Sequence, residues 1–207
     1  MYPKLTTHIK NIIQGFSSIG NNRKILLDQL AASISQQLYI KEAAKLIFIC
    51  THNSRRSQLA EIWAKQAAEY YGLKTISTYS GGTESTAFYP TAIAALEKVG
   101  FDITKTSSLS NPKYQIQFRE YANHQIFFSK KYTNEFNPQD GFLAIMVCSD
   151  ADEKCPIVLG AIERISLPYI DPKIADGTTE ETRIYEARSL EIATELFYVM
   201  QEVKKNR

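Results

Sequence analysis

One segment of the sequence, Cys50-Thr51-His52-Asn53-Ser54-Arg55-Arg56, combines a nucleophile with groups that bind an anion. Cys50 directly follows an apolar run, and Ser57 opens a stretch with helical spacing. A cysteine at the carboxyl end of a buried strand lies where open α/β sheets place their ligands. Unpaired amides of the following turn and helix attract an anion, and the guanidinium of Arg56 can hold two of its oxygens. The segment therefore predicts attack by Cys50 on a bound tetrahedral oxyanion.

The same positive field favours the thiolate of Cys50, which is the reactive form of cysteine. We expect Ser57 to donate a hydrogen bond to this thiolate. Asn53 is expected to brace the loop through its side-chain amide. The alternative is a buried, unreactive cysteine beside a solvated Arg56.

Strands that alternate with helices must position this loop. The expected strands are at residues 45–49, 75–79, 142–147 and about 162–167. The expected helices are at about 57–71, at 90–99 and from about 179 to near the end. Because continuous apolar runs are typical of strands buried on both faces, the pattern predicts an α/β fold. It has three layers, with a small parallel sheet of about four strands between helices.

Residues 1–44 carry the pattern of two helices and no recognisable chemistry. We expect them to form a helical extension that packs on the main domain or on another subunit, with an α/β domain at 45–207. An insertion at about 111–140 interrupts the alternation of this domain. It contains a predicted hairpin, 114–118 with 125–128, which we expect to extend the sheet rather than to cover the site.

Composition limits the partners and the compartment. The net charge of +2, from 24 basic and 22 acidic side chains, gives no reason to expect nucleic acid or a membrane surface as a partner. No apolar run approaches the ~18 residues of a membrane span, and the start lacks a signal-peptide core, so we expect a cytoplasmic protein. Three cysteines without a Cys-x-x-Cys pair argue against a structural zinc site.

The loop resembles that of the low-molecular-weight protein tyrosine phosphatase superfamily, which includes the thioredoxin-coupled arsenate reductases. The family loop reads Cys-x-Gly-Asn-x-Cys-Arg-Ser, and this sequence has Cys50, Asn53, Arg56 and Ser57 in register with it. The resemblance covers about residues 45–205. It implies the three-layer fold of the phosphotyrosine protein phosphatase I-like class.

Two positions depart from the family loop. His52 stands where the family has glycine; if this position requires a positive φ, histidine carries a steric cost there. His52 would then change the loop geometry or add a contact to the anion. Arg55 replaces the second cysteine, and we interpret it as a charge at the rim of the site rather than a second clamp.

The resemblance also implies an acid and a redox relay. It points to Asp171, in the step Asp171-Pro172, as the proton donor for the departing oxygen. The segment from Cys148 to Cys155 is similar to the redox helix of the arsenate reductases, which carries two cysteines at this spacing. Two helical turns would separate their Cα atoms by ~10 Å, so a disulfide between them requires local unwinding.

An arsenate reductase-like enzyme is therefore the implied function. Cys50 attacks arsenate, Cys148 releases arsenite by forming a disulfide with Cys50, and Cys155 moves the disulfide to a pair that a thioredoxin-like reductant opens. The main alternative is a low-molecular-weight protein tyrosine phosphatase that forms a Cys50 phosphoenzyme from a phosphoester, with Asp171 as general acid. A non-catalytic anion sensor is a third interpretation, disfavoured because the nucleophile and the acid are both present.

Neither a metal nor an organic cofactor is required for this chemistry. Members of the family can bind a potassium ion behind the loop, and Asn53, Glu61 and Ser80 match that site in position. An aspartate expected near Ser108 is missing, which weakens the match.

Overall fold

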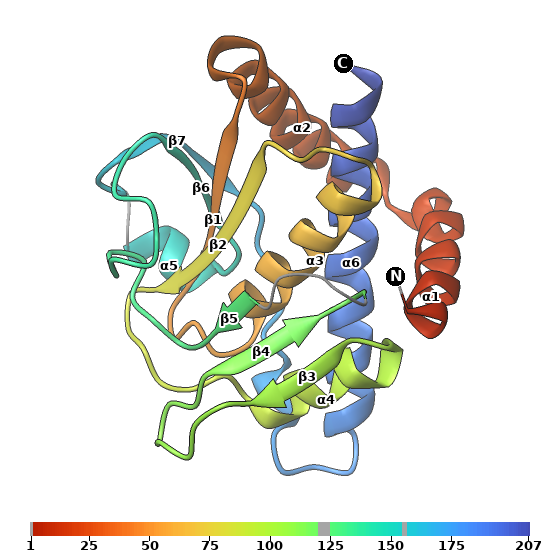
Figure 1. The fold of residues 1–207 in the computed structure, drawn as a ribbon, viewed down its shortest axis with the longest axis vertical. Helices are drawn as coiled ribbons and strands as arrows, with labels where there is room; N and C mark the ends of the chain where they lie inside the picture. The colour runs from red at the N-terminus through yellow and green to blue at the C-terminus, as the bar shows by residue number, and fades with distance from the viewer. Residues whose placement is uncertain (1, 120–124, 155–156) are drawn as a thin grey trace.

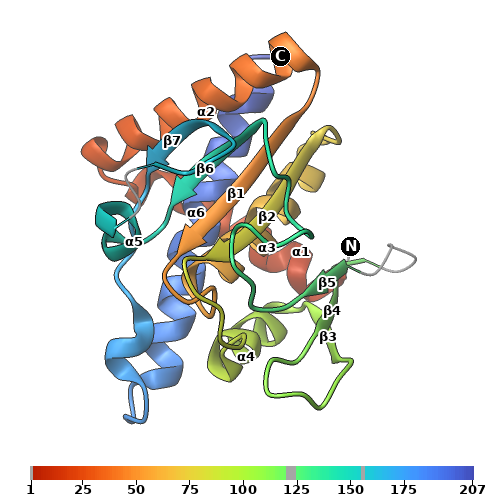
Figure 2. The ribbon, with the colours of Figure 1, turned by 90° about the vertical axis from the view of Figure 1, so that its left-hand side faces the viewer.

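The computed structural model describes residues 2–119, 125–154 and 157–207. Four strands form a parallel sheet in the order β2-β1-β6-β7 (Figure 2). They are β1 (Ala44–Cys50), β2 (Ile76–Gly82), β6 (Phe142–Met146) and β7 (Ala161–Ser166). The two central strands, β1 and β6, are almost entirely buried, as their apolar runs predicted. The small parallel sheet of the predicted α/β fold is confirmed.

Helices flank this sheet. Those that follow the first sheet strand are α3 (Arg56–Tyr70), α4 (Pro90–Val99), α5 (Ser149–Lys154), η2 (Pro172–Ala175) and α6 (Glu181–Lys205). α3 packs against β1, β2 and α6, whereas α5 lies on the opposite side of the sheet (Figure 1). Trp63 of α3 is fully buried at the contact with α6, where its indole nitrogen donates to Ser189 at 2.9 Å. In the described part of the chain, no helix has the length and apolar character to cross a membrane.

The first residues of the chain form α1 (Pro3–Gln14), η1 (Gly15–Ser18) and α2 (Asn21–Lys41). Both α-helices contact α6, and their apolar side chains, such as Ile9 and Ile34, join the main core. Arg23 of α2 donates two hydrogen bonds of 2.8 Å to the carboxylate of Glu195. The two helices thus pack on the rest of their own chain, while the division at residue 44 stays a prediction.

The insertion contributes two strands to a second sheet of three antiparallel strands in the order β3-β4-β5, and β3 precedes the insertion. These strands are β3 (Asp102–Lys105), β4 (Tyr114–Gln117) and β5 (Gln125–Phe127). The predicted hairpin is present as β4 and β5. The expectation that it extends the main sheet was wrong, because β4 pairs with β3 and the three strands form a separate sheet (Figure 2). β3 is mostly exposed and polar, so it lacked the apolar alternation of a predictable strand.

After β5 the chain returns along the end of β2. The amide of Gly82 donates to the carbonyl of Lys130 at 2.8 Å, and the amide of Tyr132 donates to the carbonyl of Gly82 at 2.9 Å. A Cβ atom on Gly81 would lie 2.3 Å from the Cα atom of Tyr132, so only glycine permits this approach. The insertion is therefore fixed beside the carboxyl end of β2, close to the oxyanion loop.

Candidate active site

The loop between β1 and α3 turns through Asn53. Cys50 is the last residue of β1, and α3 begins at Arg56. Asn53 has a φ of +48°, in the left-handed region that asparagine tolerates better than most residues. His52 is not among the described residues with positive φ, so the steric cost considered for it does not arise.

The sulfur of Cys50 lies close to two hydrogen-bond donors. The backbone amide of Asn53 donates to it at 3.2 Å, and the hydroxyl of Ser57 lies 3.1 Å away. The side-chain amide of Asn53 donates to that same hydroxyl oxygen at 2.8 Å. Because the hydroxyl oxygen already accepts this hydrogen bond, its own proton is free to point at the sulfur. Both donors are therefore directed at the sulfur of Cys50, which is only 4% exposed.

Arg56 and Asp171 are direct neighbours in space. One terminal nitrogen of Arg56 donates to the carboxylate of Asp171 at 2.5 Å, and the other donates to the carbonyl of Tyr169 at 3.0 Å. The Nε atom of Arg56 is buried and has no hydrogen-bond partner among the described residues. Asp171 caps η2 by accepting from the amide of Lys173 at 3.1 Å. The predicted clamp and the predicted acid thus lie on the same side of the loop.

Arg55 is not a charge at the rim of the site, and this interpretation was wrong. Its side chain is 12% exposed and donates to Asp176 at 2.5 Å and to the hydroxyl of Tyr185. Its guanidinium also lies 4.1 Å over the ring of Tyr89. Burial, together with the hydrogen bond to Asp176, raises the pKa of Tyr185 well above its ordinary value. Arg55 therefore ties the oxyanion loop to α6 and to the segment that follows η2.

The segment after β5 supports the loop from behind, which the sequence did not predict. The backbone amide of Lys130 donates to Oδ1 of Asn53 at 2.8 Å, and the hydroxyl of Ser129 donates to the carbonyl of His52 at 2.9 Å. The side-chain nitrogen of Asn53 also donates to Ser80 at 2.9 Å. The local sequence could not predict these contacts, because Ser129 and Lys130 each lie 77 residues from the residue to which they donate.

The side chains of the three remaining loop residues, Thr51, His52 and Ser54, contact groups other than the sulfur of Cys50. The side chain of His52 is 41% exposed, and its Nε2 atom lies 3.7 Å from the carboxylate of Glu84. Ser54 turns away from the sulfur and donates to the carbonyl of Ala87 at 2.6 Å. Thr51 places its hydroxyl 3.6 Å from the sulfur of Cys148. His52 thus lies at the mouth of the loop, and Thr51 faces the second cysteine.

Cys148 follows β6, the strand that pairs directly with β1. Its thiol is fully buried and accepts a hydrogen bond of 3.3 Å from the amide of Ala151 in α5. Cys50 and Cys148 are both free thiols; Cys50 ends β1, and Cys148 lies just beyond the carboxyl end of the neighbouring parallel strand β6. Cys155 lies outside the described residues, so the structure does not place the third predicted member of the relay.

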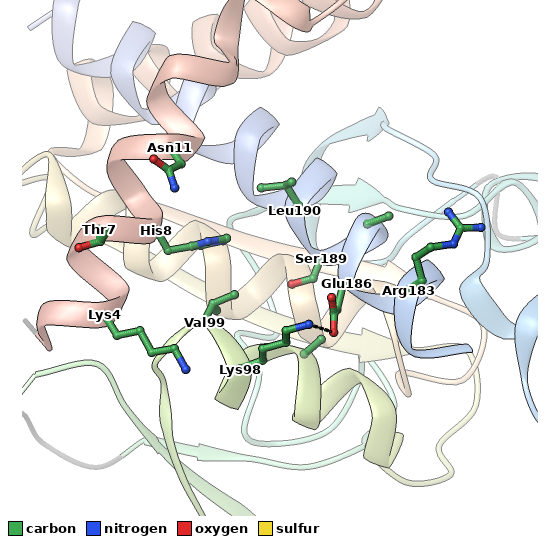
Figure 3. Close-up of a pocket in the computed structure, with 12 residues that line it drawn as sticks. Lys4, Thr7, His8, Asn11, Lys98, Val99, Arg183, Glu186, Ser189 and Leu190 are labelled. Atoms are coloured by element: carbon green, nitrogen blue, oxygen red, sulfur yellow. Dashed lines mark hydrogen bonds and ion pairs between the residues drawn. The ribbon is translucent and has the colours of Figure 1, made fainter. Parts of the chain in front are cut away.

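One cavity lies away from this loop. A cavity of about 640 Å³ opens between α1, α4 and α6 (Figure 3), with His8 and Asn11 on one wall and the 2.6 Å ion pair of Lys98 and Glu186 at its edge. Burial lowers the pKa of His8. No residue of the oxyanion loop lines this cavity, so it is separate from the candidate site. Within the described ranges, no three His, Cys, Asp or Glu side chains are grouped to hold a metal ion.

Comparison with known proteins agrees with this arrangement. Residues 45–126 match the family of low molecular weight phosphotyrosine protein phosphatases. The arsenate reductase of Bacillus subtilis (strain 168) is 34% identical over 136 residues, which are 66% of this chain and 79% of that protein. The arsenate reductase 2 of Staphylococcus haemolyticus is 34% identical over 127 residues, or 61% of this chain and 77% of that protein.

A solved structure shows the same fold. The low molecular weight protein tyrosine phosphatase from Bacillus subtilis matches with a TM-score of 0.53 at 20% identity, over 78% of this chain and 97% of that one. The chain therefore belongs to the low-molecular-weight protein tyrosine phosphatase superfamily, in its arsenate reductase-like branch. The relatives are named as enzymes, and this chain is an enzyme of the same class.

Proposed function

We propose that this protein reduces arsenate to arsenite through Cys50, Cys148 and Cys155. The position of Cys148 carries the proposal: it is a buried free thiol at the strand end beside Cys50, and its sulfur lies 3.6 Å from the hydroxyl of Thr51. A phosphatase has no use for a second thiol at this place. The arsenate reductases to which the chain is similar support the same assignment.

In the first step, the thiolate of Cys50 attacks the arsenic atom of arsenate. The loop amides and Arg56 hold the oxyanion, and Asp171 donates the proton with which one arsenate oxygen leaves as water. The hydrogen bonds from Asn53 and Ser57 hold the sulfur in place for this attack. The product is a thiol–arsenate adduct in which arsenic is still pentavalent.

The second step transfers two electrons to arsenic. The thiolate of Cys148 attacks the sulfur of Cys50, the sulfur–arsenic bond breaks, and its electron pair leaves with arsenic as arsenite. Cys155 then attacks Cys148, forms the 148–155 disulfide and frees the thiolate of Cys50. An external dithiol of the thioredoxin type reduces this disulfide. No metal or organic cofactor takes part, and a reducing compartment such as the cytoplasm suits the free thiols.

Phosphatase activity is the second candidate. The short contact between Arg56 and Asp171 favours it, because hydrolysis of a Cys50 phosphoenzyme needs only this clamp, this acid and a water molecule. The phosphate adduct offers no reducible centre, so Cys148 would remain unused.

Two activities measured on one preparation separate these candidates. The wild type should release arsenite from arsenate in the presence of a thioredoxin-type donor. Cys50→Ser should lose both this reaction and the hydrolysis of a small aryl phosphate. Cys148→Ser should lose arsenite release and keep most of its hydrolysis. A wild type that hydrolyses the aryl phosphate but forms no arsenite would identify a phosphatase.

A further inference from the structure

A buried ion pair lies behind the oxyanion loop. Lys130 and Glu61 are 5% and 7% exposed, and the ammonium nitrogen of Lys130 lies 3.9 Å from the carboxylate of Glu61. The same ammonium lies 5.1 Å from the centre of the Phe128 ring. Burial raises the pKa of Glu61, and the charge of Lys130 opposes this change most strongly. Burying two charges costs free energy that their mutual attraction often does not offset. We therefore expect this pair to have a specific role.

Contacts connect this pair to the loop. The backbone amide of Lys130 donates to Oδ1 of Asn53 at 2.8 Å, and Nδ2 of Asn53 donates to Ser80 at 2.9 Å. The hydroxyl of Ser80 in turn opposes the rise in the pKa of Glu61, whose carboxylate faces the ammonium of Lys130. Asn53 is also the residue whose backbone amide reaches the sulfur of Cys50. The position of Lys130 is therefore coupled to the nucleophile through one residue.

The residues present do not fit a potassium ion at this place. The backbone amide of Lys130 donates to Oδ1 of Asn53, so a cation at this place would depend mainly on the carboxylate of Glu61. The carboxylate of Glu61 faces an ammonium, and a second cation beside Lys130 would be repelled.

We propose that Lys130 supplies a built-in cation in place of potassium and is a positioning residue for the oxyanion loop. It neutralises Glu61, which holds Ser80, and Ser80 and the Lys130 amide together hold the side chain of Asn53. The proposal rests on oxyanion binding by the loop, and it does not depend on the reduction of arsenate.

Substitution of Lys130 should convert the built-in cation site into one that needs an added ion. Glu61 and Lys130 line a cavity of about 380 Å³ together with Thr78 and Phe128, which gives small cations a route to the carboxylate. The measurement is the affinity for inorganic phosphate, by calorimetry and by protection of Cys50 from iodoacetamide. It is made in potassium, sodium and choline chloride at one ionic strength.

The wild type should bind phosphate equally in all three salts. Lys130→Ala should bind roughly tenfold more weakly in choline chloride, and potassium should restore most of the loss. Lys130→Arg should retain the affinity because it keeps the charge. The control is Lys131→Ala, which removes an exposed neighbouring charge and should leave the affinity unchanged in every salt.

Three results would overturn the proposal. They are a wild type whose phosphate affinity depends on potassium, an unchanged affinity in Lys130→Ala, and a loss that no cation repairs. The first needs no variant, so the test holds even if Lys130→Ala does not fold. A wild type that binds phosphate independently of potassium but reduces no arsenate would contradict the proposed function alone.

Discussion

The carboxylate of Asp171 lies 2.5 Å from the guanidinium of Arg56, the group expected to clamp the substrate. An oxyanion that reaches Arg56 must therefore displace or share this carboxylate. In Asp171→Asn the neutral amide competes less with the anion and cannot act as an acid. We expect several-fold tighter phosphate binding together with a fall in kcat of about 10²–10⁴. Calorimetry and turnover on one preparation test this; weaker binding with an unchanged kcat would contradict it.

Arg56→Lys should be far from conservative. An ammonium cannot hold two oxygens in the geometry of the guanidinium fork, so phosphate affinity and turnover should both fall by about 10²–10³. The matched variant is Arg55→Lys, which loses contacts to Tyr185 and Asp176 outside the loop. It should lower the free energy of unfolding by about 1–3 kcal/mol and reduce turnover less. Equal losses of phosphate affinity in both variants would show that the clamp is assigned wrongly.

Ser57→Ala should slow the reaction of Cys50 with iodoacetamide at neutral pH. The substitution removes the hydroxyl that lies 3.1 Å from the sulfur, and we expect a fall of about tenfold for one lost hydrogen bond to a charge. The control is Ser54→Ala, since the Ser54 hydroxyl contacts the carbonyl of Ala87 instead. The role given to Ser57 fails if both variants react like the wild type.

Asp152 should control how fast the disulfide moves to Cys155. Its carboxylate accepts from Ser166 at 2.7 Å and lies 2.5 Å from Arg164, so it anchors α5 to β7. Because the transfer requires α5 to unwind, Asp152→Asn should accelerate the formation of the 148–155 disulfide several-fold in stopped-flow experiments. The exposed Asp150 provides the control as Asp150→Asn, which should not change the rate. Slower formation of the 148–155 disulfide in Asp152→Asn would contradict the inference that Asp152 anchors α5.

The parts of the site that are contiguous in sequence were predictable. A strand, a loop and a helix in immediate succession carry their own pattern, which predicted that Cys50 ends β1 and that α3 follows the loop. The apolar run before Cys148 predicted the neighbouring strand in the same way. In each case the burial of a continuous segment determines both the element and the location of the residue that ends it.

The contacts that cross the chain were not predictable. Arg55 contacts Asp176 and Tyr185 at separations of 121 and 130 residues, and its sequence neighbours gave no sign that its side chain is only 12% exposed. Lys130 lies in an insertion whose relation to the loop depends on how it returns along β2. Such contacts depend on packing between elements, for which a single sequence carries no local signal.

In the proposed mechanism, Cys148 completes the reaction that Cys50 begins. Mass spectrometry of the protein after a single arsenate turnover, without a reductant, tests it most directly. The relay predicts a 148–155 disulfide in the wild type, a 50–148 disulfide in Cys155→Ser, and in Cys148→Ser no arsenite and no disulfide. A wild type in which Cys148 remains a free thiol after arsenite release, or repeated turnover of Cys148→Ser with a thioredoxin-type donor, would contradict it.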